Sequence, residues 1–252
     1  MNEIVAEHSP ATGLARALSK LGFCSRAQAG LLIRAGRVHL NGVVRRDPET
    51  PVRLGEDRID IDGKPIAAAK KIYLALNKPR GIVTTASDEK GRDTVYSLLG
   101  VELPWVAPVG RLDKASEGLL LLTNDSEWAA RITAPETHLD KTYHVQIGKI
   151  GDAALLETLK NGVRSKEGEM LRVKGASLLR QGERNSWLEI ILDEGKNRHV
   201  RRMLETLGIV VLRLIRVAIG PLVLGALVKG AVRQLTAEEK LALDRAMKKT
   251  TK

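Results

Sequence analysis

The chain has 252 residues, of which 43% are hydrophobic and 3% aromatic, and its formal net charge is +11. This length allows two domains of unequal size, and the strong positive charge indicates a polyanionic partner, either nucleic acid or an anionic membrane surface. A membrane span is excluded, because the most apolar stretch, residues 210–228, is interrupted by Arg213, Arg216 and Pro221.

The beginning of the chain and its metal-ligand residues exclude further classes of protein. Residues 1–10 carry Glu3 and Glu7 and lack a basic start followed by an apolar block, so we expect a disordered N-terminus and no secretion signal. Cytoplasm is therefore the expected location. Cys24 is the only cysteine, which excludes an intrachain disulfide and zinc sites built on paired cysteines. The five histidines are scattered, so we expect no metal site.

The first structured segment is strongly basic. No Asp or Glu occurs between residues 11 and 46, although the segment holds several Arg and Lys. Leu14, Leu18 and Leu21 recur at helical spacing, which predicts a short helix that Gly22 ends. Clusters of basic residues most often only form the solvent-exposed face of a helix, but the complete lack of carboxylates in this segment favours RNA binding.

A second helix and a hairpin follow. Ser25 and Gln28 form the pattern of a capping box, which predicts a helix that ends at Gly36. Alternating apolar residues around Asn41-Gly42 predict a hairpin. Helix, helix and hairpin over Leu14 to Gly63, with Cys-Ser-Arg and Gly-Arg-Val-x-x-Asn-Gly, resemble the alpha-L RNA-binding domain. The resemblance implies that residues 11–66 form this domain, that 67–71 are a linker, and that the RNA contacts are Arg16, Lys20, Arg26, Arg34 and Arg37.

A catalytic body is expected over residues 72–240, followed by a basic C-terminal tail over 241–252. Residues 72–76 read as a strand, which the Lys78-Pro79 loop breaks and residues 82–85 resume. The block Gly-Arg-Leu-Asp at residues 110–113 then places Asp113 on a turn directly before a run of leucines that predicts a buried strand. Such a scaffold presents one acid, although an isolated Arg-x-Asp pair would more often be a surface ion pair.

Five further patterns follow in the chain. Ser126 begins a predicted helix, and residues 141–147 alternate as a strand that carries Tyr143. Residues 188–204 predict a strand, a Gly loop and a helix with Arg198, Arg201 and Arg202 in its first turns. Residues 210–220 read as a strand, and Thr236 with Glu239 caps a last short helix.

The blocks Lys-Pro-x-Gly, Gly-Arg-Leu-Asp, Lys-x-Tyr-x-Val and Glu-Gly-x-x-x-x-Val-Arg-Arg-Met, in this order, resemble the bacterial ribosomal RNA pseudouridine synthases. The resemblance implies an α+β fold, in which the small RNA-binding domain precedes a mixed, largely antiparallel sheet with flanking helices. It also implies that Asp113 is catalytic, that Arg201 forms an ion pair with it, and that Tyr143 stacks on the uracil and is the candidate base at carbon 5. Implied substrate contacts are Lys78, Arg111, Asn197 and Arg198.

The chain departs from the family pattern at His199, where Gln is usual, and at Ser116, where Thr is usual. Both keep a hydrogen-bonding group, so we expect a tuned contact and a working enzyme.

The implied reaction isomerises a uridine of ribosomal RNA to pseudouridine, without a cofactor or metal, after the nucleotide is flipped out of the stack. Asp113 could attack the anomeric carbon, add to the uracil ring or remove a ribose proton, and the sequence leaves these routes open. It also leaves open the target uridine and the ribosomal subunit. We expect a monomer.

Two rival functions account for part of the sequence. A catalytically silent ribosomal RNA-binding or assembly protein would share the charge and the first domain, but the joint presence of Asp113, Tyr143 and Arg201 argues against it. A glycoside hydrolase using Asp113 and Glu117 would need a sugar cleft rich in aromatic residues, which this composition disfavours.

Overall fold

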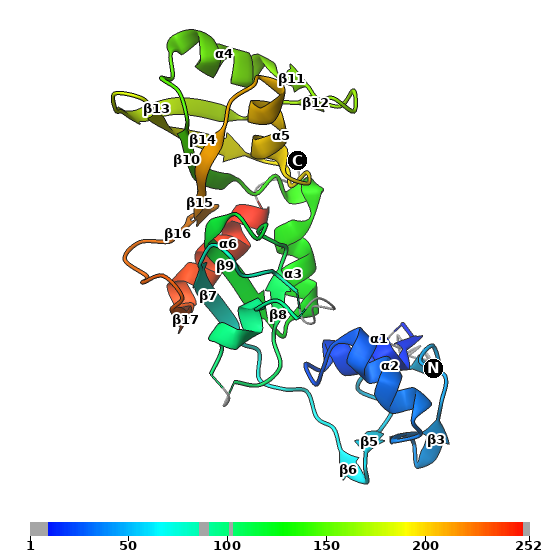
Figure 1. Cartoon of the computed structure of the whole chain (residues 1–252). Coiled ribbons are helices and arrows are strands. Elements are labelled where there is room, and N and C mark those ends of the chain that lie inside the picture. Colours follow the sequence, from blue (N-terminus) through cyan, green and yellow to red (C-terminus); the bar gives the residue numbers. More distant parts are fainter. Residues whose placement is uncertain (1–9, 86–90, 101–102, 249–252) are drawn as a thin grey trace, which may run out of the picture. The chain divides into compact units, whose positions relative to one another are not determined.

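The chain divides into two compact units in the computed structural model, which describes residues 10–85, 91–100 and 103–248. Unit 1 comprises residues 10–72 with two short later segments, residues 103–107 and Thr123–Glu127, and unit 2 comprises the other described residues (Figure 1). The predicted disorder of the N-terminus concerns residues that lie outside the described ranges, apart from Pro10. No described helix is long and apolar enough to cross a membrane.

Two helices of unit 1 follow the sequence patterns closely. Helix α1 spans Leu14–Lys20 and is followed by Gly22 at φ +75°. Helix α2 spans Arg26–Arg34, and Ser25 and Gln28 form both bonds of the predicted capping box. Both expected helices are thus confirmed, because each depends on a local signal that needs no tertiary context.

The strands of unit 1 form two small sheets. The predicted hairpin is present as β2 (Val38–Leu40) and β3 (Val43–Arg45), and the turn residues Asn41 and Gly42 both have positive φ angles, 53° and 81°. Strands β5 (Ile59–Ile61) and β6 (Lys64–Pro65) complete a four-stranded sheet of order β3-β2-β5-β6. A second sheet pairs β1 (Thr12–Gly13) with β4 (Pro51–Val52). The helices and strands share one apolar core that includes Leu14, Leu18, Ile33, Val38, Val52 and Ile59.

Unit 2 is built on a mixed, largely antiparallel sheet, as expected. Its strand order is β13-β14-β10-β15-β9-β7-β17, with β16 paired to β15 and β8 paired to β9. The strands are β7 (Tyr73–Lys78), β8 (Ala107–Val109), β9 (Glu117–Thr123), β10 (Lys141–Ile147), β13 (Gly175–Gln181), β14 (Ser186–Leu192), β15 (Val211–Ile219), β16 (Leu222–Val223) and β17 (Val232–Gln234).

One short parallel contact joins the two halves of this sheet. Strands β9 and β15 pair only at Ile215 with Glu117 and at Arg216 with Gly118. Gly118 has φ +106°, and a Cβ added there would lie 2.3 Å from the carbonyl oxygen of Arg216. A glycine is therefore required at this position by both the backbone conformation and the close approach of the strands.

Helices cover each half of the sheet and bury a separate core. Helices α4 (Ala153–Asn161) and α5 (His199–Thr206) pack on the β10, β14 and β15 half. Helices α3 (Ser126–Thr133) and α6 (Ala237–Lys248) pack on the β7 and β9 half, where Trp128 and Leu243 are buried (Figure 1). Two short 3-10 helices, η1 (Val95–Leu98) and η2 (Pro135–Thr137), and a small hairpin of β11 (Val163–Arg164) and β12 (Met170–Leu171) complete the fold.

Two local predictions were wrong. Residues 82–85 form no strand; only an isolated bridge joins Val83 to Thr94. The predicted tail over 241–252 is the second half of α6 as far as Lys248, where Leu243 and Met247 are buried. These two apolar residues are four positions apart and so lie on one helix face, which packs into the core despite the basic residues around it.

Candidate active site

A turn held from several directions carries Asp113. The ammonium of Lys78 donates to the main-chain oxygens of Asp113 at 3.2 Å, Ser116 at 2.9 Å and Pro79 at 3.1 Å. Thr84 Oγ1 donates to the main-chain oxygen of Leu112 at 2.8 Å. These bonds fix the backbone on both sides of Asp113, so that the carboxylate starts from a well-defined position.

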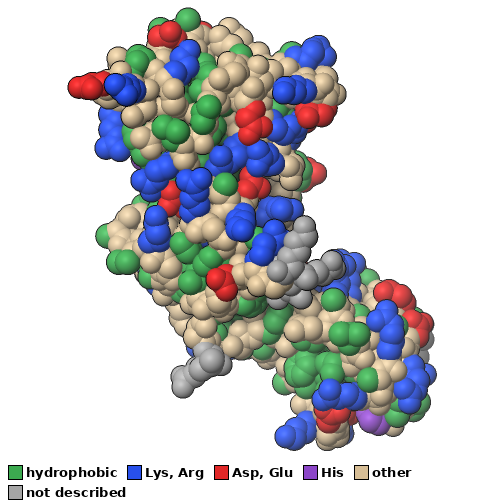
Figure 2. All heavy atoms as spheres, in the orientation of Figure 1, with side chains coloured by type: hydrophobic (Ala, Val, Ile, Leu, Met, Phe, Trp, Pro, Cys, Tyr) green, Lys and Arg blue, Asp and Glu red, His purple; other side chains and the backbone are tan. Residues whose placement is uncertain are grey.

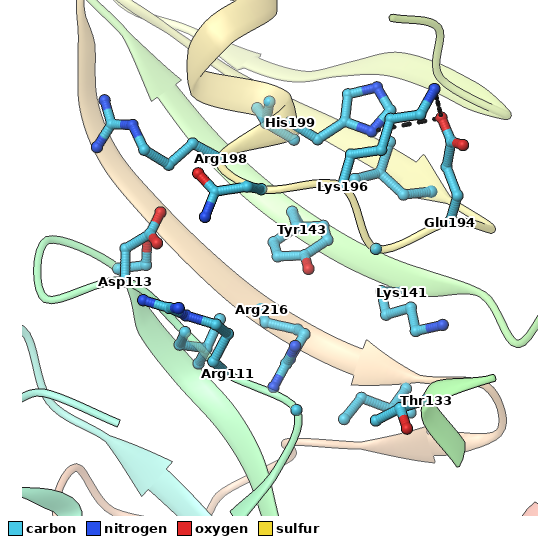
Figure 3. Close-up of a pocket in the computed structure, with 18 of the residues that line it drawn as sticks. Arg111, Asp113, Thr133, Lys141, Tyr143, Glu194, Lys196, Arg198, His199 and Arg216 are labelled. Atoms are coloured by element: carbon cyan, nitrogen blue, oxygen red, sulfur yellow. Dashed lines mark ion pairs between the residues drawn. The ribbon is translucent and has the colours of Figure 1, made fainter. Parts of the chain in front are cut away.

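Asp113 and Tyr143 line the same cavity, whose volume is about 280 Å³. The lining comes mainly from four parts of unit 2: the turn that carries Asp113, strand β10 with Tyr143, strand β15, and the loop from Glu194 to Arg198 ahead of α5. Figure 3 shows Tyr143 between Asp113 and Lys141, with Arg198 and His199 on the side of the loop. The expected acid and the expected phenol thus meet at one site, although they are separated by 30 positions in the chain.

Arg201 reaches the same turn but makes no ion pair with Asp113 within 4 Å. Its Nη2 donates to the main-chain oxygen of Ala115 at 2.8 Å and lies 3.5 Å from Ser116 Oγ. The side chain is buried, and burial, assisted by the charge of Arg198, lowers its pKa, whereas Asp113 raises it. The direct pair that the family resemblance implies is therefore absent from this structure, because the guanidinium is engaged by the backbone of the turn.

Lys78 has a different place from the predicted substrate contact. The side chain is fully buried, does not line the cavity, and directs its ammonium to the three carbonyls described above. Burial lowers its pKa from 10.5 to about 8. Lys78 supports the turn from behind and is a positioning residue.

The other three predicted substrate contacts do line the cavity. Arg111, Asn197 and Arg198 are all exposed at its edge. Arg198 precedes α5 with φ +49°, so it lies in the loop and not in the helix as predicted, and its Nη2 pairs with Glu205 at 2.8 Å. Exposed cations at the edge of a cavity suit the phosphates of an RNA strand.

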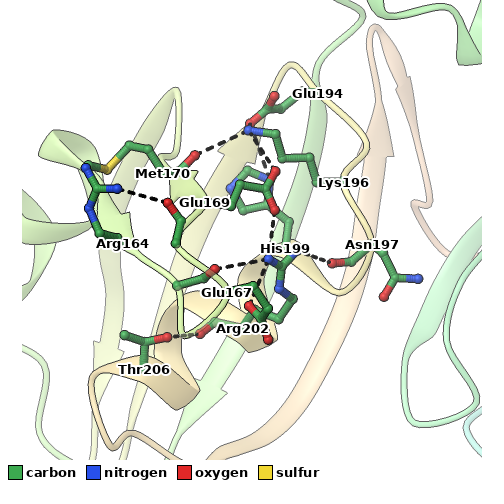
Figure 4. A network of polar contacts seen from close by, with 12 residues as sticks. Arg164, Glu167, Glu169, Met170, Glu194, Lys196, Asn197, His199, Arg202 and Thr206 are labelled. Atoms are coloured by element: carbon green, nitrogen blue, oxygen red, sulfur yellow. Dashed lines mark hydrogen bonds and ion pairs between the residues drawn. The ribbon is translucent and has the colours of Figure 1, made fainter.

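A network of ion pairs holds the loop that carries these residues (Figure 4). Lys196 Nζ lies 2.9 Å from Glu194 and 3.4 Å from Glu169, and Arg202 Nη2 lies 2.7 Å from Glu169. Since Glu169 belongs to the connection between β11 and β12, the network ties that hairpin to α5 and to the loop. The small hairpin, which the sequence patterns did not indicate, thus supports one wall of the cavity.

His199, the departure from the family pattern, is buried at the start of α5 and lines the cavity. Its Nδ1 lies 3.6 Å from Glu194 Oε1. Burial lowers the pKa of this imidazole, while the charge of Glu194 raises it. The side chain therefore contributes to the same wall as the ion-pair network.

Sequence reasoning missed three cations that line the cavity, Lys141, Lys196 and Arg216. Arg216 interrupts the apolar pattern of β15, and in the sequence this interruption indicates only that the segment does not span a membrane. Lys141 belongs to the same block as Tyr143. A signal was available, because Lys141 lies two positions before Tyr143 on one strand and so faces the same side of the sheet.

The predicted RNA contacts of unit 1 fall into two groups. Lys20 and Arg37 are engaged: Lys20 pairs with Glu127 at 2.9 Å, and Arg37 pairs with Asp62 at 2.5 Å. Three others are exposed and make no side-chain hydrogen bond or ion pair with described residues, namely Arg16, Arg26 and Arg34. Figure 2 shows Lys and Arg side chains distributed over both units on the face in view.

Together these features define a protein with a basic helix-and-hairpin unit and a mixed-sheet unit that presents one acid beside a tyrosine. Residues 72–206 match the family model of RNA pseudouridylate synthases, and residues 12–59 match that of the S4 domain. The chain therefore belongs to the RNA pseudouridylate synthase family and is an isomerase of the pseudouridine synthase class. Both resemblances found in the sequence are confirmed.

Relatives and a solved structure agree with this assignment. The chain is 36% identical over 227 residues to the ribosomal large subunit pseudouridine synthase B of Bacillus subtilis, covering 90% of this chain and 93% of the relative. It is 39% identical over 232 residues to an uncharacterized RNA pseudouridine synthase of Aquifex aeolicus, covering 91% and 92%. A crystal structure of a pseudouridylate synthase matches with a TM-score of 0.64 and 30% identity, over 92% of this chain and 99% of that one.

Proposed function

We propose that this protein isomerises a uridine of ribosomal RNA to pseudouridine, with Asp113 as the acid that acts on the nucleoside. The observation that carries the proposal is that Asp113 and Tyr143 line one cavity and that the turn bearing the acid is fixed by the Lys78 ammonium. The similarity to a pseudouridine synthase named for the ribosomal large subunit supports the choice of RNA.

The reaction breaks the bond between N1 of uracil and C1′ of ribose, turns the base, and joins its C5 to C1′. The target nucleotide leaves the RNA stack to enter the cavity. Asp113 attacks C1′, adds to the ring or removes a ribose proton, and each route needs the carboxylate held against the nucleoside. The Tyr143 ring stacks on the uracil, and its hydroxyl, or a water that it orients, takes the proton from C5.

The remaining side chains divide into contacts and supports. Arg111, Asn197 and Arg198, exposed at the edge of the cavity, bind the backbone of the flipped nucleotide. Arg201 and Lys78 do not touch the substrate; they hold the turn of Asp113 through its carbonyls.

Unit 1 provides affinity for folded RNA through its unengaged cations. Arg16, Arg26 and Arg34 contact phosphates, which positions the enzyme without reading bases. Binding that depends on such contacts weakens as salt rises, because counterions are released from the RNA.

The protein acts as a monomer, and in the cytoplasm, where ribosomal RNA is found. The support for a monomer is that the residues of a single chain line the cavity and provide both the acid and the phenol.

Tritium release from ribosomal RNA labelled at C5 of uracil tests the proposal. Small- and large-subunit RNA are assayed separately with the wild-type protein and with Asp113→Asn. Asp193→Asn is the matched control, since Asp193 lies next to the loop but does not line the cavity. We expect release by the wild type and the control, no release by Asp113→Asn, and RNA affinity unchanged in all three.

Two results would contradict the proposal. Equal release by Asp113→Asn and the wild type would remove Asp113 from the chemistry. RNA binding without release from either RNA by the wild type would instead indicate a catalytically silent ribosomal RNA-binding protein.

A further inference from the structure

Arg216 is a buried cation on the floor of the cavity with no role in the mechanism so far. It lies on β15, directly opposite Tyr143 on β10 in the register of the sheet, so the two side chains share one face. Only 6% of the residue is exposed, and it lines the cavity. Its Nε donates to the main-chain oxygen of Leu119 at 2.7 Å.

The rest of the guanidinium is not satisfied by the protein. Nη2 is buried without a hydrogen-bond acceptor among the described residues, and no described carboxylate lies within 4 Å of the side chain. Lys141 lines the same cavity, and its pKa is lowered first by burial and then by the charge of Arg216. Buried cations that lack partners are unfavourable, which indicates that this end of the cavity is built for an electron-rich ligand.

The depth of the cation decides which part of a nucleotide it faces. Arg111 and Arg198 are exposed at the edge of the cavity, where the phosphates of a continuous RNA strand remain. Arg216 is inside and beside Tyr143, the residue that stacks on the base. A donor in this position is suited to the base itself, whose electron-rich atoms are its two carbonyl oxygens.

We propose that Arg216 donates a hydrogen bond to a carbonyl oxygen of the flipped uracil and stabilises the negative charge that the base acquires during isomerisation. The inference rests on the proposed function. When the N1–C1′ bond breaks, its electron pair passes to the base and spreads from N1 to the carbonyl oxygens. C5 then bonds to C1′, the C5 proton leaves, and N1 takes up a proton, so atoms and charge balance.

This role fits each of the routes left open for Asp113. Attack at C1′ and removal of a ribose proton both release uracil as an anion, and a fixed cation stabilises that charge as it forms. Addition of the Asp113 carboxylate to C6 of the uracil ring moves negative charge onto O4, so that route is assisted as well if Arg216 donates to O4.

The test measures single-turnover rate constants for wild type and Arg216→Gln on RNAs that carry uridine, 2-thiouridine or 4-thiouridine at the target position. Sulfur is a weaker acceptor than oxygen, so the analogue altered at the contacted oxygen should slow the wild type about tenfold. Arg216→Gln should be about a hundredfold slower than wild type on uridine, and the same sulfur should not slow it further. Arg180→Gln is the matched control, because it removes the same charge from an exposed position on β13 outside the cavity, and it should behave as the wild type.

A purely structural role through the bond to Leu119 gives a different pattern. It predicts a lowered melting temperature and sulfur effects of equal size in wild type and variant for both analogues. Either that additivity or a wild-type rate in Arg216→Gln would overturn the inference. Should Arg216→Gln not fold, Arg216→Lys is compared instead: its shorter side chain keeps the charge but loses the planar donor group, so the sulfur effect should again be smaller than in the wild type. In all these outcomes the wild type converts uridine; if it converts none, the proposed function fails instead.

Discussion

Replacement of Lys78 by Met should separate stability from activity. The side chain is fully buried, and its ammonium donates to three main-chain oxygens on and next to the turn of Asp113. Met has a similar length and volume, so the change removes the charge and its donors while leaving little empty space.

Two terms of similar size oppose each other in the free energy of unfolding. The drop of the Lys78 pKa from 10.5 to about 8 corresponds to a penalty of about 3 kcal/mol on the charged form in the folded protein. Leaving three carbonyls without their donor costs about 1 kcal/mol each, which together is about as much. We therefore expect Lys78→Met to change the free energy of unfolding by no more than about 1 kcal/mol.

Activity should respond differently, because it depends on the position of one carboxylate. A displacement of the turn by about 1 Å can lower the rate by about a hundredfold. Single-turnover pseudouridine formation and urea denaturation would measure the two effects, with Lys114→Met, an exposed lysine of the same turn, as the control. Unfolding that is easier by more than about 3 kcal/mol, or a rate equal to that of the wild type, would refute the reasoning.

Three further predictions follow from the described contacts. Between pH 7 and 9.5 the free energy of unfolding of the wild type should rise by about 2 kcal/mol. The folded state releases the Lys78 ammonium proton near pH 8, whereas the unfolded chain holds it to about pH 10.5. Urea titrations at the two pH values should show this rise in the wild type and not in Lys78→Met. Arg34→Gln should reduce the slope of log affinity against log salt by about 0.7 to 0.9, whereas Arg37→Gln, which removes a cation already paired with a carboxylate, should leave it nearly unchanged; filter binding at several salt concentrations checks this. Gly118→Ala should lower the free energy of unfolding by about 3 kcal/mol or more, because the added Cβ would clash with the carbonyl of the facing strand. Gly81→Ala, which has a similar φ but open space around it, should lower it by about 1 to 2 kcal/mol, and thermal unfolding measures both variants.

The sequence predicted those elements whose signal is local. The capping box of Ser25 and Gln28 and the Asn41-Gly42 turn each specify a backbone conformation within a few residues. The failure at residues 82–85 has the opposite cause. An apolar run has no pairing partner until the tertiary fold supplies one, and here only a single bridge forms at Val83.

The site residues show the same division between features that a local sequence pattern predicts and contacts that only the folded chain creates. The family blocks placed Asp113 and Tyr143, which do line one cavity, but they could not show that Arg201 engages a carbonyl of the turn or that Lys78 is hidden behind it. Those arrangements depend on distances between segments that are far apart in the chain. Hydropathy shows a charge inside an apolar strand, such as Arg216, only as an interruption and does not show on which face of the sheet the side chain lies.

The parallel contact between β9 and β15 has a consequence for how the two reacting groups are aligned. The acid leads into β9 on one half of the sheet, whereas the phenol lies on β10 in the other half, and only two residue pairs connect these halves along that seam. The gap between carboxylate and phenol therefore depends on this short pairing at Gly118, together with the hydrogen bond from Arg201 to the turn of Asp113. Outer strands at either margin can lengthen or change sequence over evolution without disturbing that alignment, whereas a single added methyl group at the seam disturbs it directly.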